Sequence, residues 1–121
     1  MSNPGNHHKI NYIEFASTDI ERTKQFYGTV FGWSFKDWGP AYIDCNATSS
    51  GVAVGFYKAD PHDAQPKTAP LVVLFSANLE ATEAAVVAAG GSIVVPIFEF
   101  PCGRRFHFCD EVGNVLGVWS E

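Results

Sequence analysis

The sequence contains few basic residues and no long apolar run. Its 121 residues carry 8 Lys plus Arg against 13 Asp plus Glu, which gives a formal net charge of -5. Because binding to nucleic acid or to an anionic membrane relies on clustered positive charge, this balance argues against both as partners. The strongly apolar stretch from Leu71 to Phe75 is far too short to span a bilayer.

Cysteine is also scarce. Cys45, Cys102 and Cys109 are odd in number and show no Cys-x-x-Cys spacing, so we expect reduced thiols rather than a disulfide framework. Residues 1–8 are polar and contain no apolar segment that resembles a signal peptide. We therefore expect a cytosolic (cytoplasmic) protein whose first residues form a frayed arm, with its two adjacent histidines solvated.

Aromatic residues, in contrast, are abundant. The chain has ten Phe, four Tyr and three Trp, and 46% of its residues are hydrophobic. Such side chains either fill a core or line an apolar cavity for a flat ligand, and composition leaves both open. A chain of this length buries one real core and is too short for two, so we expect a single domain over residues 1–121.

A strand, helix, strand pattern spans Lys9 to Phe35 and returns in weaker form 59 positions later. Asp19 and Asn78 are good helix N-caps, and glycine closes each predicted helix. The chain is therefore predicted to contain two copies of one unit, with any site between them. The matched positions are 13–16 with 72–75, 19–21 with 78–80, and Gly32 with Gly91.

Each unit is predicted to have the order βαβββ, and a Pro-containing linker at 59–70 joins them. In the first unit (9–58) we expect strands at 9–17, 33–38, 41–46 and 51–58, a helix from Asp19 to Gly32 and a turn at 48–51. In the second unit (71–121) we expect strands at 71–75, 92–95, 104–109 and 115–120, a helix from Asn78 through Ala89, a loop at 96–103 and a turn at 110–114.

Three segments resemble the glyoxalase/bleomycin-resistance/extradiol-dioxygenase superfamily, also called vicinal oxygen chelate proteins: Asp19 to Trp33, Leu79 to Gly91, and Asp110 to Trp119. The resemblance covers nearly the whole chain. It implies an α+β fold in which two βαβββ modules form one open barrel-like sheet around a cleft, often completed across a homodimer. Because these segments are helix, turn and packing positions, they indicate the fold more than the activity.

In metal-dependent members of the superfamily, His, Gln or Glu side chains from the first and fourth strands of both modules hold a divalent ion. The resemblance places these positions at Tyr12, near Gly55, at Leu71 and at Gly117. Two glycines and a leucine cannot ligate through their side chains, and a neutral Tyr is a poor ligand. We therefore predict no metal and no other cofactor, unless the register of the fourth strands differs by one residue.

Glu14 is the candidate catalytic residue. It shares a strand face with Tyr12, so it should point into the cleft, where desolvation would raise its pKa toward that of a useful general base. The alternatives are a carboxylate that pairs with Arg104 or Arg105, or one that lies at a wet cleft mouth.

The residues predicted to contact a ligand beside Glu14 are mostly aromatic. Aromatic walls suit a planar ligand, and the alternative for each of them is ordinary core packing. Glycines at the former ligand positions would leave space, which favours an enlarged cavity. The predicted set is Tyr12, Trp38, Tyr42, Phe56, Phe75 and Arg104, with Phe98 and Phe100 in a loop that could close over the cleft.

Residues 104–109 alternate strictly, so Phe106 and Phe108 face one side and the polar side chains face the other. We expect the phenylalanines to point inward, because burying two rings is worth several kcal/mol. His107 would then be outward and inert. In the reverse orientation, His107 becomes a candidate acid or base beside Glu14.

These observations predict a glyoxalase/bleomycin-resistance-like homodimer that binds a small organic ligand without metal. The alternative is a superfamily enzyme. It would be either metal-free with Glu14 as base, or a lactoylglutathione lyase-like or dioxygenase-like protein whose metal ligands lie in another register.

Overall fold

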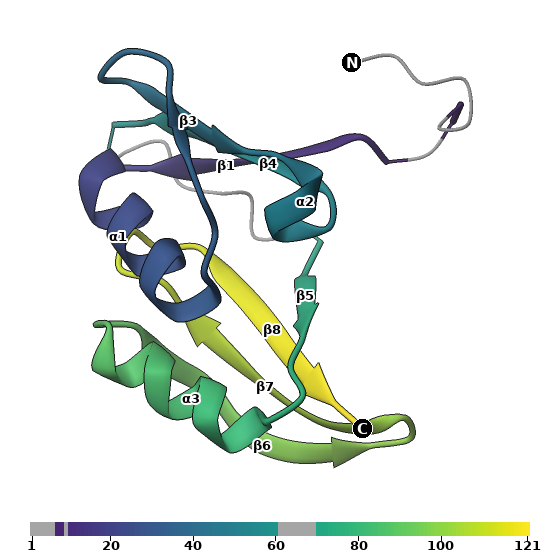
Figure 1. The fold of residues 1–121 in the computed structure, drawn as a ribbon. Helices are drawn as coiled ribbons and strands as arrows, with labels where there is room; N and C mark the ends of the chain where they lie inside the picture. The colour runs from purple at the N-terminus through teal and green to yellow at the C-terminus, as the bar shows by residue number, and fades with distance from the viewer. Residues whose placement is uncertain (1–6, 9, 61–69) are drawn as a thin grey trace.

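The computed structural model describes residues 7–8, 10–60 and 70–121, which form two similar modules (Figure 1). The first module contains β1 (Tyr12–Ser17), α1 (Ile20–Phe31), β2 (Lys36–Asp37), β3 (Tyr42–Cys45), the short helix α2 (Ala47–Ser50) and β4 (Ala53–Lys58). The second module contains β5 (Val72–Phe75), α3 (Leu79–Ala88), β6 (Ser92–Phe100), β7 (Gly103–Cys109) and β8 (Val115–Ser120).

Each module has its own four-stranded sheet, in the orders β1-β4-β3-β2 and β5-β8-β7-β6. In both sheets the fourth strand lies in the interior, parallel to the first strand and antiparallel to the third. The predicted α+β class with two βαβββ modules is confirmed. Among the described residues the two sheets remain separate and open, and they do not close into a barrel.

The predicted repeat is visible in the hydrogen bonds that join each first strand to its helix. The hydroxyl groups of Ser17 and Thr23 are 2.7 Å apart, and those of Ser76 and Thr82 are also 2.7 Å apart. Ser76 and Thr82 lie 59 positions after Ser17 and Thr23, respectively. The same local structure is therefore built twice.

The helix ends follow their capping residues. Asp19 accepts a hydrogen bond from the backbone N–H of Arg22, and Asn78 accepts one from that of Ala81, both at 3.1 Å. These bonds satisfy N–H groups that an uncapped helix leaves without partners. Gly32 ends α1 in the left-handed region, with φ 72°, where glycine is favoured.

The two modules share one core. Phe26 and Phe31 of α1 lie 6.0 and 5.9 Å, centroid to centroid, from the ring of Phe108 on β7. The buried Tyr27 donates a hydrogen bond to Asp110 of the second module at 3.0 Å. Apolar packing and a buried hydrogen bond thus join α1 to the second sheet.

Three predicted boundaries were wrong. β6 continues through the expected loop to Phe100, with irregular pairing around Pro96. A proline is tolerated there because β6 is an edge strand and its bulges need no donor at that position. The expected turn at 48–51 contains α2, whose first turn is capped by Asn46. β2 is shorter than predicted because Trp33 leaves the strand direction to enter the core.

Residues 1–6, 9 and 61–69 lie outside the described part of the chain, and they include most of the predicted arm and linker. His7 and His8 are exposed. Within the described ranges, no helix is long and apolar enough to cross a membrane.

Candidate functional site

Each sheet has one face packed against the helices and one open face. In the first sheet, Ile43, Val54 and Phe56 point into the core and are 0 to 3% exposed. Because strand side chains alternate, their neighbours along each strand point the other way. The register pairs Glu14 with Gly55 and Gly55 with Asp44, so these positions lie in one row across the open face.

Two tyrosines and a carboxylate form a hydrogen-bonded cluster on this open face. The hydroxyl groups of Tyr12 and Tyr42 are 2.5 Å apart, and the Tyr42 hydroxyl donates to Glu14 Oε2 at 2.9 Å. We call Tyr12, Tyr42 and Glu14 the tyrosine cluster. Three residues predicted from the sequence to form a site are thus brought into contact.

Gly55 makes room for the tyrosine cluster. A Cβ atom at this position would lie 2.1 Å from the hydroxyl oxygens of both Tyr12 and Tyr42. Real atoms do not approach so closely, so a larger residue would displace the two hydroxyls. The position at which the resemblance implies a metal ligand is here filled by phenol groups from neighbouring strands.

The tyrosines of the cluster remain neutral phenols. Burial and the hydrogen bonds with Tyr12 and Glu14 raise the pKa of Tyr42 well above its usual value. Burial also raises the pKa of Tyr12, although the hydrogen bond with Tyr42 opposes this shift. A neutral phenol can donate and accept hydrogen bonds, but it lacks the negative charge that binds a divalent ion well.

The other residues predicted to contact a ligand lie in different places. Trp38 is 55% exposed, and the Lys36 ammonium nitrogen lies 4.0 Å from the centroid of its ring. Phe56 is fully buried in the core, and Arg104 pairs with Glu80 of α3. Neither Phe56 nor Arg104 reaches the open face.

The alternation rule could have identified Phe56 as a core residue. It follows Gly55 directly, so the two positions cannot face the same side of a strand. The same rule finds two open-face residues that the sequence reasoning missed, Tyr57 and Asp44. Tyr57 lies two residues after Gly55 on β4, and Asp44 lies two residues after Tyr42 on β3.

The open face of the second sheet is apolar and basic. Phe106 and Phe108 are 0% exposed in the core, as predicted, so His107 lies on the opposite side. A Cβ atom added to Gly117 would lie 3.3 Å from the His107 ring and 3.4 Å from Leu71. His107 is therefore outward, yet it lies on the face where the predicted ligand positions of this module meet.

The four positions at which the resemblance implies metal ligands thus lie in two neighbouring pairs, Tyr12 with Gly55 and Leu71 with Gly117. Within each pair the space is taken by phenol or apolar groups, so the residues present do not fit a divalent ion. No group of three or more His, Cys, Asp or Glu that could hold a metal occurs among residues 7–8, 10–60 and 70–121.

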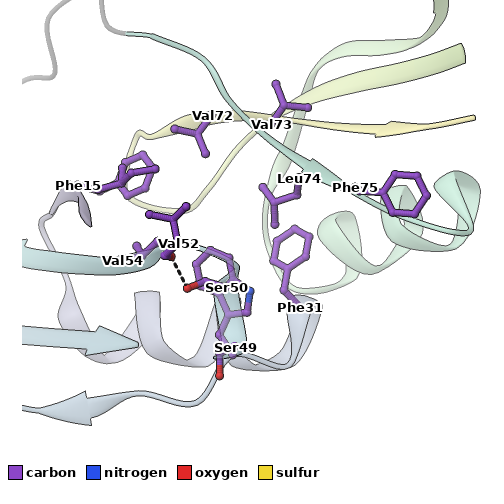
Figure 2. Close-up of a pocket in the computed structure, with 12 residues that line it drawn as sticks. Phe15, Phe31, Ser49, Ser50, Val52, Val54, Val72, Val73, Leu74 and Phe75 are labelled. Carbon is purple, nitrogen blue, oxygen red and sulfur yellow. Dashed lines mark hydrogen bonds between the residues drawn. The ribbon is translucent and has the colours of Figure 1, made fainter. Parts of the chain in front are cut away.

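A cavity of about 420 Å³ lies at the seam between the modules (Figure 2). Its walls come from the core side of the first sheet, from α1 and from both sides of β5. Phe75, which was predicted to contact a ligand, is among them. The polar side chains in the wall are Ser49 and Ser50, and the Ser50 hydroxyl donates to the backbone oxygen of Val52 at 2.7 Å. This space suits an apolar group.

Comparison with known proteins agrees with this architecture. The model of the Glyoxalase/Bleomycin resistance protein/Dioxygenase superfamily matches residues 9–118. The chain belongs to this superfamily. The match covers both modules and so includes both open faces.

A curated relative of this superfamily chain is named "Putative glyoxylase CFP32", from Mycobacterium bovis and Mycobacterium tuberculosis. The two sequences are 29% identical over 116 residues. The alignment covers 91% of this chain and 44% of the relative. The chain therefore spans less than half the length of the curated proteins it matches.

Solved structures share the fold. A glyoxalase-related enzyme from Fulvimarina pelagi has a TM-score of 0.77 and 18% identity, and the match covers 94% of this chain and 88% of that chain. The fosfomycin resistance protein FosX from Listeria monocytogenes has a TM-score of 0.76 and 14% identity, over 93% of this chain and 89% of that chain. That FosX structure contains Mn(II) and a dihydroxypropylphosphonic acid.

Proposed function

We propose that this superfamily chain is a metal-independent protein that binds a small organic ligand at the tyrosine cluster. The observation that carries the proposal is the fit between Gly55 and the two phenol groups, which occupy the family's metal-ligand region. The space that a metal and its ligands would take is used instead for hydrogen bonds between side chains. The whole chain of residues 1–121 acts as one domain in this proposal.

The chemistry of the cluster indicates which ligand group it binds. Glu14 is an acceptor with one oxygen already bonded to Tyr42, and its other oxygen is left for a donor. A second carboxylate, Asp44, lies in the same row across the sheet. An amine or amide group would therefore fit here, and the exposed ring of Trp38 offers a flat wall for an aromatic ligand.

A homodimer would enclose this site. In a single chain, Tyr12 is 39% exposed and Phe75 is 55% exposed, so large apolar surfaces of both sheets face solvent. The open face of the first sheet carries Glu14 and Asp44, whereas that of the second carries Arg105 and His107. Opposite charges favour pairing of the first sheet with the second sheet of another copy.

An enzyme of the same superfamily is the second candidate function, and one feature of the tyrosine cluster favours it. Tyr42 holds the Glu14 carboxylate in a fixed position, as a metal-free general base requires. FosX shows that this fold can hold Mn(II), but the glycines and leucine at the corresponding positions argue against a metal-dependent lyase or dioxygenase here.

Metal independence is tested by elemental analysis of dialysed protein, followed by titration with nickel, zinc, iron(II) and manganese. A parallel sample lacks residues 1–8, since His7 and His8 could bind stray metal. We expect the truncated protein to retain less than about a tenth of an equivalent of any ion. One tightly held ion per chain would contradict the proposal and make a metal-dependent enzyme the leading candidate.

Ligand binding at the tyrosine cluster is tested with benzylamine, a basic primary amine that carries an aromatic ring and so matches the predicted chemistry. We expect Tyr42→Phe and Glu14→Gln each to weaken its binding about tenfold, measured by NMR titration. Tyr57→Phe is the matched control, because Tyr57 lies on the same face outside the cluster. Equal binding by all four proteins would overturn the proposed site. Loss of turnover in Glu14→Gln with a candidate substrate would instead favour the enzyme.

A further inference from the structure

Arg105 on β7 has no carboxylate partner within the described part of the chain. Among the described residues, Arg22 pairs with Glu111 and Arg104 pairs with Glu80, whereas Arg105 takes part in no ion pair. Its guanidinium carbon lies 5.2 Å from the ring centroid of Phe98 and 5.0 Å from that of Phe100. These rings hold the guanidinium on the open face of the second sheet.

Two nitrogen atoms on this face are buried without a hydrogen-bond partner. They are Nε of Arg105 and Nε2 of His107. Leaving a buried polar group unpaired is unfavourable, and the penalty is larger for a charged group. The terminal nitrogens of Arg105 are neither bonded nor among the buried unpaired atoms, so they reach the surface. The guanidinium can therefore meet a molecule that approaches from outside.

Among the residues that the structure describes, the surroundings of these nitrogens are apolar, and no acidic side chain pairs with Arg105 or His107. His107 pairs in register with Gly117 on β8, and the Phe98 ring of β6 lies 5.7 Å from its ring. Burial and the nearby Arg105 lower the pKa of His107, and no carboxylate opposes this shift. Glu99 pairs in register with Arg104, so it belongs to the other face. In a protein of net charge -5, this is a local positive site.

We propose that Arg105 and His107 bind the carboxylate of a small aromatic acid. The two residues lie two positions apart on one strand face, so their Cα atoms are about 7 Å apart and their side chains can converge on one carboxylate. An arginine fork matches a carboxylate in shape as well as charge. This inference adds a second binding group to the proposed function. It rests on that function in one respect, because the carboxylate is taken to belong to the same ligand that binds at the tyrosine cluster.

The aromatic rings beside Arg105 favour an acid that itself carries an aromatic ring. The Trp119 ring lies 5.1 Å from the Phe75 ring and 6.3 Å from the Phe100 ring, both edge-on. Trp119 also pairs in register with Arg105. A flat ring attached to the carboxylate can stack against this group while the guanidinium holds the charge.

Benzoate is the probe, and benzamide is its neutral counterpart. Binding is followed by NMR titration of the full chain, which also reports whether each variant is folded. We expect benzoate to bind at least about tenfold more tightly than benzamide, and Arg105→Gln to lose at least about tenfold in benzoate affinity. Arg104→Gln is the matched control, because Arg104 directly precedes Arg105 but faces α3. Its benzoate affinity should stay within about twofold of that of the unchanged protein. Benzoate should also raise the His107 pKa.

Equal benzoate binding by Arg105→Gln and Arg104→Gln would overturn the inference. Failure of benzoate to bind would also overturn it. If Arg105→Gln and Asp44→Asn then both weaken self-association in sedimentation, Arg105 forms an intersubunit ion pair instead. Benzylamine separates the two proposals. If benzoate binds as described and benzylamine does not, the anion site stands and the tyrosine cluster proposal fails. If benzylamine binds as described and benzoate does not, the tyrosine cluster stands and the anion site fails.

Discussion

The two modules have the same framework and opposite open faces. The Ser–Thr hydroxyl pair and the N-cap bond recur at matched positions and matched distances. On the open faces, each polar or acidic residue of the first module corresponds to an apolar or basic residue of the second. The corresponding positions are Tyr12 and Leu71, Glu14 and Val73, Tyr42 and Arg105, Asp44 and His107, and Tyr57 and Trp119.

This difference shows which residues the fold requires. The framework residues are buried or bonded within the chain, so replacing them destabilises the module. Open-face side chains lie outside the shared core, so the fold alone does not set their identity. In our proposals one sheet binds a hydrogen-bond donor and the other binds an acid, and the asymmetry between the modules supports a ligand with two different ends.

The largest expected effect concerns the shared core. Phe108→Ala should lower the free energy of unfolding by about 3–5 kcal/mol, because a fully buried ring is replaced by a cavity. Since Phe108 touches Phe26 and Phe31 of the other module, both modules should unfold in one transition. Urea denaturation followed by circular dichroism and by tryptophan fluorescence checks this. Two separate transitions would show that the modules are stable independently.

The two open-face glycines should respond differently to the same change. Gly55→Ala should lower stability by about 1–3 kcal/mol, since the new methyl group displaces the Tyr12 and Tyr42 hydroxyls. At Gly117 the nearest atoms are 3.3 Å or more away, so Gly117→Ala should change stability by less than about 1 kcal/mol. The urea midpoints of the two variants are compared. Equal losses of stability would contradict the expectation that Gly55 has less space for a methyl group than Gly117.

The two N-caps should behave alike. Asp19→Ala and Asn78→Ala each remove one capping bond of 3.1 Å, so each should lower stability by about 1 kcal/mol. Thermal and urea unfolding of both variants measure the effect. If only one variant is destabilised, the two capping bonds do not contribute equally to stability, although their geometry is the same.

The smallest expected effect is a dependence on pH from the second open face. The pKa of His107 is lowered in the folded state, so the native protein binds fewer protons than the unfolded chain just below the usual pKa of about 6.5. Stability present above about pH 6.5 is therefore lost as the pH falls through that value toward the folded-state pKa. His107→Gln should flatten the decline in urea midpoint between about pH 7.5 and 5. An unchanged slope would assign the decline to other groups.

Much of the fold could be predicted because local signals fixed it. Asp19 and Gly32 mark the ends of α1, and the β8 strand agrees with its predicted range. The extension of β6 past Pro96 could not be predicted, because it depends on pairing with β7, which lies later in the chain. Tertiary pairing here overrides the local preference of proline for loops.

The site was only partly predictable for a related reason. Tyr12 and Glu14 follow from alternation on one strand, but their bond to Tyr42 depends on the register of three strands. The unpaired state of Arg105 depends on where Glu80 and Glu99 lie in space, which no local pattern encodes.

The interior position of β4 and β8 also affects the order in which the chain matures on the ribosome. The first sheet has all its strands once residue 58 has been synthesised, whereas the second needs residues 115–120 to fill the place between β5 and β7. Until β7 and β8 are made, the apolar side of α1 lacks its partner Phe108. A nascent chain therefore leaves this side of the helix without its partner until β7 has been synthesised, and we expect chaperones to be able to bind the first module up to that point.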